Sequence, residues 1–339
     1  MNIFRTELLP KFSDKKINHN SSLLTIGSCF SDSIGNKLNE YKFPVLVNPF
    51  GTVYNPISIH EALKQAIGLT YPTKISYLEH QGLYFNYNFH SKFCATNEDD
   101  LVSQIKTGIN RSHEFIKKSK VLIITYGTSF VYKRTDTNEI VANCHKLPGS
   151  RFNKRLLSVD EILLSFQSLH KSISENLSIE KIILTVSPVR HIKDTLELNS
   201  LSKSILRIAC QALVNQYSEV EYFPSFEIMM DDLRDYRFYK DDLIHPTLMA
   251  EEYIWEKFST VYLDSQTLHF VKQWKDIQKA LKHQPFQIES TSHKMFLHET
   301  LARLEELKSL ADVEKEITQL KSQLNQRSNT KSQKPSAKS

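Results

Sequence analysis

Short apolar runs alternate with longer amphipathic segments along most of the chain. The apolar runs are bounded by turn-forming residues, which is typical of buried strands, and lie at 22–26, 44–47, 120–125, 181–186 and 219–222. The segments between them carry apolar residues at helical spacing, at 32–40, 57–67, 99–118, 158–176 and 193–217. This alternation predicts an α/β fold, a three-layer α/β/α sandwich with a mainly parallel sheet and a ligand crevice at the carboxyl ends of its strands.

Two stretches depart from the alternation. Residues 74–93, rich in Tyr and Phe, and residues 129–142 have the pattern of antiparallel hairpins, the second turning at Asp136–Asn138. We expect these hairpin insertions to shape the rim of a site. Helical patterns return at 247–258 and 264–283.

A separate amphipathic segment follows at 294–325. Its apolar residues alternate between spacings of three and four, the rhythm of a coiled-coil seam, at Leu310, Val313, Ile317, Leu320 and Leu324. A similar rhythm upstream is broken between 304 and 310. The stripe has two interpretations: a helix that packs on its own domain, or a coiled coil used for self-association or partner binding.

These patterns divide the chain into four parts. We expect an N-terminal lead-in at 1–20, an α/β domain at 21–285, a C-terminal amphipathic helix at 290–325 and a disordered basic tail at 326–339. The tail lacks the large apolar residues that would let it pack.

The net charge of +5 belongs to the C-terminus and not to the predicted domain. After Glu316 there is no acidic residue, while five basic ones follow, which leaves 38 basic against 38 acidic residues in the rest of the chain. Binding a phosphate backbone requires clustered Lys and Arg on the folded domain. The balanced charge therefore argues against a nucleic-acid enzyme.

Cysteine usage and hydropathy bear on the compartment. Cys29, Cys94, Cys144 and Cys210 are scattered without a CxxC pair or a zinc-like Cys/His spacing, which favours a reducing compartment and predicts no metal site. No apolar run approaches a membrane span, and the first residues contain no signal-like apolar core. We expect a cytoplasmic protein that does not enter a membrane.

The segment LLTIGSCFSDSIG, residues 23–35, carries the strongest chemical signal. An apolar run ends at Gly27, presents Ser28 and Cys29, and continues as an amphipathic helix from Asp32. Such a strand-to-helix turn exposes a nucleophile beside the electropositive end of a helix. The sequence DLIH places Asp242 three residues before His245, a carboxylate–imidazole pair that complements such a nucleophile.

Several motifs together resemble the GSCFA-domain family. They recur in order as GSCFSDSIG, NPFGTVYNP, NFHSKF, ITYGTSFVY, NCHKLP, SPVRH and DLIHP. That family is similar to a branch of the SGNH, or GDSL-type, hydrolases, in which a Gly-Asp-Ser motif carries the nucleophile. The resemblance implies a three-layer α/β/α fold, with His245 as general base and Asp242 as the group that orients it.

The resemblance leaves the nucleophile and the oxyanion hole open. Alignment with Gly-Asp-Ser puts Cys29 at the nucleophile position, with Ser28 as the alternative. Gly51 is the candidate oxyanion glycine. Gly127-Thr128-Ser129 stands where those hydrolases have Gly-x-Asn, so the side-chain donor is absent or comes from Ser129 or Asn143.

Further polar residues follow predicted strands or hairpins. Asn143, Cys144 and His145 could contact substrate, form a structural hydrogen-bond cluster, or contain a second Cys-His nucleophile pair. Arg190 and His191 are placed to bind an anionic or hydroxylated substrate or to lie at a solvated helix start, and His90 is placed at a pocket wall.

The sequence therefore predicts a hydrolase that cleaves an ester or other acyl bond of a small molecule or glycan through an acyl-enzyme, without a cofactor. One alternative is an acyltransferase that modifies a sugar or glycan. The other is a non-catalytic binding protein that retains the crevice.

Overall fold

The computed structural model describes residues 6–283, 286–287 and 290–329. Five parallel strands form its central sheet, in the order β10-β9-β5-β1-β2. Their bounds are β1 Leu23–Gly27, β2 Val45–Val47, β5 Val121–Tyr126, β9 Lys181–Val186 and β10 Val220–Tyr222. The apolar runs of the sequence thus become neighbouring strands, and the α/β prediction is confirmed.

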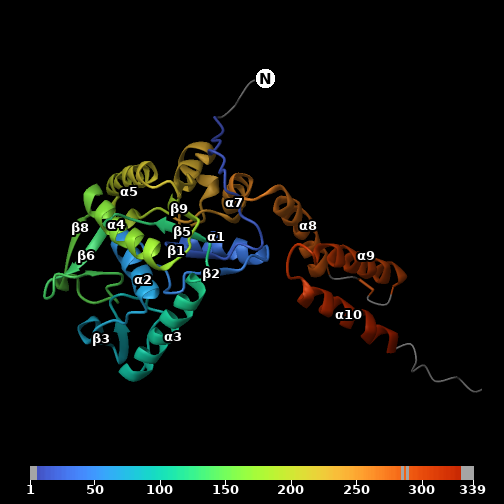
Figure 1. Cartoon of the computed structure of the whole chain (residues 1–339), viewed down its shortest axis with the longest axis horizontal. Coiled ribbons are helices and arrows are strands. Elements are labelled where there is room, and N and C mark those ends of the chain that lie inside the picture. The colour runs from blue at the N-terminus through green and yellow to red at the C-terminus, as the bar shows by residue number, and fades with distance from the viewer. Residues whose placement is uncertain (1–5, 284–285, 288–289, 330–339) are drawn as a thin grey trace, which may run out of the picture.

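Helices cover both faces of this sheet (Figure 1). One face packs against α2 Pro56–Gly68, α3 Glu98–Ile116, α4 Val159–Asn176 and α5 Leu196–Gln216; the other packs against α1 Cys29–Glu40 and α7 Leu248–Tyr262. Alternation along each strand separates the two cores: Leu122 and Ile124 of β5 enter the first core, and Val121 and Ile123 enter the second.

The strand order reverses between β1 and β5, because the chain continues from β1 to β2 on one side and returns to β5 on the other. Such a reversal opens a crevice at the carboxyl ends of the strands. Gly27 ends β1 at this point with φ 137°, and a Cβ there would lie 2.1 Å from the Thr125 carbonyl oxygen. Glycine is therefore required where the chain turns from β1 into α1.

Both predicted hairpins form. β3 Tyr77–His80 pairs with β4 Leu83–Asn86, and β6 Phe130–Arg134 pairs with β7 Ile140–Val141. The second hairpin gains a strand that the sequence did not indicate, β8 Phe152–Leu156, which pairs with β6 along its whole length.

Short helical turns connect the larger elements. They are η1 Lys74–Ser76, η2 Gly149–Arg151, η3 Ile192–Asp194, α6 Ser225–Glu227, the π-helical η4 Ile228–Leu233 and η5 Tyr236–Phe238. Among the helices in the described ranges, none has both the length and the hydropathy needed to cross a bilayer.

The C-terminal segment folds as two helices, the first packed on α8 Ser265–Lys282 and the second packed on the first. α9 Thr291–Leu307 and α10 Glu314–Asn329 lie beside each other, away from the sheet (Figure 1). The single amphipathic helix expected at 290–325 is thus two helices, and the stripe lies in α10 and the residues just before it, with Val313, Ile317 and Leu320 buried within the chain. The fold supports the packing interpretation of this stripe, and a coiled coil is not shown. The predicted disordered tail lies outside the described residues from 330 onward, while α10 occupies 326–329.

Candidate active site

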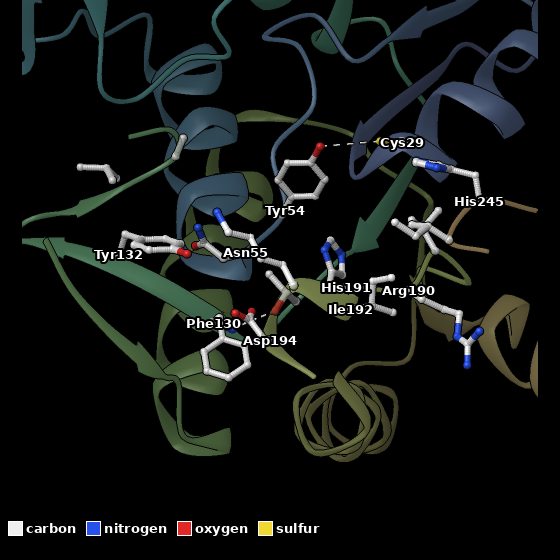
Figure 2. Close-up of a pocket in the computed structure, with 16 residues that line it drawn as sticks. Cys29, Tyr54, Asn55, Phe130, Tyr132, Arg190, His191, Ile192, Asp194 and His245 are labelled. Carbon is white, nitrogen blue, oxygen red and sulfur yellow. Dashed lines mark hydrogen bonds between the residues drawn. The ribbon is translucent and has the colours of Figure 1, made fainter. Parts of the chain in front are cut away.

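The loops that follow the sheet strands enclose a pocket of about 380 Å³ (Figure 2). Its walls come from five places: the start of α1, the loop between β2 and α2, the hairpin after β5, the loop that follows β9 and the loop that precedes α7. The lining residues are Cys29, Tyr54, Asn55, Thr128, Phe130, Tyr132, Val141, Ala142, Val189, Arg190, His191, Ile192, Lys193, Asp194, Ile244 and His245. The crevice expected at the carboxyl edge of the sheet is therefore a formed pocket.

Cys29 and Ser28 differ in where their side chains lie. Cys29 is partly exposed and lines the pocket. Ser28 is 1% exposed, lies against Gly127, and has a buried hydroxyl without a hydrogen-bond partner within the described structure. α1 begins at Cys29, three residues earlier than the sequence suggested, so the Cys29 backbone N–H is one of the donors that a helix start leaves without an intrahelical partner.

Tyr54 is the side chain that contacts the Cys29 thiol. Its hydroxyl lies 3.7 Å from Cys29 Sγ, within hydrogen-bond range for sulfur (Figure 2). Burial raises the pKa of the Tyr54 hydroxyl, and the neighbouring Cys29 adds to the rise. Tyr54 therefore keeps its proton near neutral pH and can donate it to sulfur.

His245 is held by Asp242 through a compact loop. His245 Nδ1 lies 2.7 Å from Asp242 Oδ2, while Asp242 Oδ1 accepts the backbone N–H groups of Ile244 and His245. These hydrogen bonds, the His245 backbone N–H first, lower the pKa of Asp242 to about 2. Because the ionised carboxylate only accepts hydrogen bonds, Nδ1 carries the proton and Nε2 of a neutral ring is left to accept one.

Arg190 supports the loop that carries His245. Its backbone N–H donates to the Ile244 carbonyl, and its guanidinium lies over the rings of Tyr239, at 4.9 Å, and Tyr236, at 5.4 Å. Figure 2 shows the guanidinium directed away from Cys29 and Tyr54. The residue thus lines the pocket while its charge lies against neighbouring aromatic rings.

The candidate oxyanion residues have other partners. Gly51, at φ 77° in the loop after β2, donates its N–H to the Asn48 carbonyl, and Gly127 donates its N–H to the Tyr54 carbonyl. Ser129 is fully buried and donates its hydroxyl to Ser202 Oγ. These groups shape the loops behind the pocket. Two hydrogen-bond donors lie next to the thiol: the backbone N–H of Cys29 itself, and the Tyr54 hydroxyl, which contacts Sγ.

The remaining predicted residues, Asn143, His145 and His90, do not line the pocket. His145 is buried, lies 3.1 Å from Ser91 Oγ and 2.9 Å from the Asn86 carbonyl, and receives support from Asn143, whose Oδ1 accepts its backbone N–H. His90 Nδ1 accepts the backbone N–H of Lys92 and lies outside the pocket lining. The contacts of His145 thus join the loop after β7 to the β3–β4 hairpin and the loop that follows it.

A buried lysine lies behind the pocket. Lys203 of α5 is 1% exposed, and its Nζ donates to the carbonyls of Gly127, at 2.7 Å, and Ser187, at 2.8 Å. Lys203 therefore links the ends of β5 and β9. Burial lowers the pKa of Lys203 to about 7, and burial together with this nearby ammonium lowers the pKa of His191 to about 4. His191 is consequently a neutral pocket residue near pH 7.

Lys203 should make stability depend on pH in a specific window. Between pH 7 and the ordinary lysine pKa near 10.5, the unfolded chain holds a proton that the folded chain has released. The free energy of unfolding should therefore rise with pH by up to about 1.4 kcal/mol per unit. Urea unfolding at pH 7, 8 and 9 should show this rise in the native chain relative to Lys203→Met. Parallel curves for the two proteins would contradict the assignment.

Sequence reasoning missed several pocket residues. Tyr54 and Asn55 lie in the NPFGTVYNP motif, but no chemical pattern marked them as neighbours of the thiol. Phe130 and Tyr132 alternate along β6, a signal that a hairpin face meets the site. Lys203 lies within a helical pattern, and its position there gave no sign that it is buried behind the pocket. Within the described parts of the chain, no group of three or more His, Cys, Asp or Glu side chains is arranged to hold a metal ion.

Fold and site together define an α/β protein with a parallel sheet, a thiol after its first strand and an imidazole–carboxylate pair before a late helix, all at one pocket. The chain belongs to the GSCFA family, whose profile matches residues 22–258, and the profile of the GSCFA C-terminal domain matches residues 274–326. The second match spans the second half of α8, all of α9 and most of α10.

Comparison with solved structures found one described as "The structure of a putative platelet activating factor from Streptococcus pneumonia". It has 14% identity and a TM-score of 0.37 over 72% of this chain and 84% of that one. No curated protein matched the chain.

Proposed function

We propose that this protein is a hydrolase that cleaves an ester bond through an acyl-enzyme on Cys29. The observation that carries the proposal is that Cys29 and His245, from opposite ends of the α/β domain, line one pocket (Figure 2). Asp242 holds the His245 ring through Nδ1. Nucleophile, base and orienting carboxylate are the three groups that acyl transfer requires.

In the first step His245 Nε2 takes the proton of the Cys29 thiol, and the sulfur attacks the carbonyl carbon of the ester. A C–S bond forms while the carbonyl electron pair moves to oxygen. When this oxyanion collapses, the C–O bond to the alcohol breaks and the His245 imidazolium returns the proton to the departing alkoxide. The products are a thioester on Cys29 and a free alcohol.

In the second step water replaces the alcohol. His245 Nε2 takes a proton from water, the resulting hydroxide attacks the thioester, and collapse breaks the C–S bond. The carboxylic acid leaves, and the proton returns to the sulfur. Asp242 remains ionised throughout, since its pKa of about 2 lies far below neutral pH.

The oxyanion needs donors aimed at the attacked carbonyl. We assign this role to the backbone N–H of Cys29, at the positive end of α1, and to the Tyr54 hydroxyl beside the sulfur. Gly51 and Gly127 are not assigned, because their N–H groups already donate to carbonyls.

Alkylation tests the proposal. Iodoacetamide near pH 7 should modify Cys29 faster than Cys94, Cys144 or Cys210, because Cys29 lines the pocket at a helix N-terminus. Burial raises the pKa of Cys144 to about 11 and also raises that of Cys210, which should slow both reactions.

Modification should remove turnover of a panel of acyl esters in step with Cys29 labelling. Transfer of the acyl group to an added sugar faster than to water would identify the acyltransferase alternative. If no ester of the panel shows turnover that depends on His245, the result would contradict the proposed hydrolase and favour the non-catalytic binding protein.

A further inference from the structure

The walls of the pocket beside Cys29 are mainly apolar. Aromatic and aliphatic side chains contribute half of its lining, and these are Tyr54, Phe130, Tyr132, Val141, Ala142, Val189, Ile192 and Ile244. A pocket of about 380 Å³ with such walls has room for a small organic group. The walls therefore select for hydrophobic surface in whatever group reaches Cys29.

The charges around the pocket are neutralised or directed elsewhere. Asp194 is paired with Lys154 of β8, and Arg190 stacks on tyrosines with its guanidinium pointing away from Cys29 (Figure 2). Burial holds His191 neutral. Lys193 also lines the pocket, and it is exposed to solvent and not buried in the interior. The interior thus presents no buried charge with which an ionised acyl group would pair.

The aromatic end of the pocket lies opposite the thiol. In Figure 2 Phe130 and Tyr132 lie at the far side from Cys29 and His245, with Tyr54 between the two groups. The Lys154 ammonium lies 4.5 Å from the Phe130 ring centre and 5.6 Å from that of Tyr132, and its pairing with Asp194 links β8 to η3. A group whose carbonyl is at Cys29 must extend along the pocket to contact these rings.

Exposed apolar side chains adjoin the same loops. Ile192, which lines the pocket, is 41% exposed, and Leu243, next to the pocket residue Ile244, is 48% exposed. Leu196 at the start of α5 is 52% exposed. Apolar surface that continues from an apolar pocket is what a hydrophobic ligand contacts on entry.

We infer that the pocket binds an uncharged, straight acyl chain of several carbons, with the carbonyl at Cys29 and the chain directed toward Phe130. This inference rests on the proposed function and names its substrate class. An acetyl group would leave the aromatic end of the pocket unfilled. Phe130 and Ile192 are thereby specificity-determining residues.

Ester chain length tests this inference. Each added methylene from p-nitrophenyl acetate to hexanoate should raise kcat/KM about threefold, for a total of about 100-fold. Phe130→Ala should lower the hexanoate-to-acetate ratio about tenfold, and Ile192→Ala, at an exposed position less critical for folding, should lower it severalfold. Leu164→Ala, on the exposed side of α4, is the control and should keep the ratio. Equal rates for acetate and hexanoate, or a ratio that Phe130→Ala and Ile192→Ala leave unchanged, would overturn the inference.

Direct binding separates failure of the inference from failure of the proposed function. If neither ester is hydrolysed, the proposed function fails, and binding of N-methylhexanamide and N-methylacetamide decides the inference. Ligand-observed NMR should then detect the hexanamide and not the acetamide, and the signal should weaken in Phe130→Ala. Equal signals for the two amides, or no signal for either, would overturn the inference.

Discussion

Replacing Cys29 with alanine should lower kcat for a hydrolysed ester by about 10⁴-fold or more, because loss of a nucleophile removes the covalent route entirely. Steady-state kinetics with the best ester of the panel measure this effect. The variant should still fold, since Cys29 is partly exposed and its contact is with the Tyr54 hydroxyl.

Ser28→Ala is the matched control for that experiment. The Ser28 hydroxyl is buried without a partner among the described residues, and an unpaired buried hydroxyl costs about 1–3 kcal/mol. Its removal should keep turnover within a few-fold of the native chain and leave the protein equally or more stable. A loss of turnover in Ser28→Ala with retention in Cys29→Ala would assign the nucleophile to Ser28 instead.

Replacing His245 with alanine should lower kcat about 10²- to 10⁴-fold, because the thiol then lacks the base that takes and returns its proton. Asp242→Asn should produce a comparable loss, since an amide in place of the carboxylate no longer fixes the proton on Nδ1. Rates measured near neutral pH should show both losses.

Asp241→Asn provides the control for the carboxylate. Asp241 is the exposed neighbour of Asp242, so its replacement changes the net charge equally and should leave kcat nearly unchanged. If Asp241→Asn and Asp242→Asn reduce kcat to the same extent, the effect belongs to the charge of the loop and not to the contact with His245.

The parts of this architecture that depend on neighbouring residues could be predicted from the sequence. The apolar runs became the five strands, and Asp242 and His245 meet because the loop between them is only two residues long. The turn after β1 was equally local, since Gly27 marks where the strand ends. These features follow from periodicity and from backbone conformations that few residues adopt.

The parts of the architecture that depend on contacts between distant segments could not be predicted from the sequence. Whether Ser28 or Cys29 faces the pocket depends on where α1 begins and on the loop at Gly127 that packs against Ser28. Likewise, the sequence made Gly51 a candidate oxyanion donor, but in the fold its N–H donates to the Asn48 carbonyl. Tyr54 approaches the thiol through the fold of its loop, which no spacing in the sequence encodes.

The C-terminal stripe illustrates the same limit. Its heptad-like spacing is compatible with a coiled coil, but the break between α9 and α10 lets α10 fold back on α9, which packs on α8. Val313, Ile317 and Leu320 of the stripe are buried by this arrangement, so these residues pack within one chain. Periodicity identified the buried face of these helices and left open what covers it.

Trapping the acyl-enzyme is the most direct test of the account. The full chain is mixed with p-nitrophenyl hexanoate, quenched in acid within the first turnovers, and digested for mass spectrometry of the peptide that contains Ser28 and Cys29. The account predicts a hexanoyl group on Cys29 that disappears as turnover ends and does not form in Cys29→Ala. Turnover without any acyl group on this peptide, or with the group on Ser28, would contradict it.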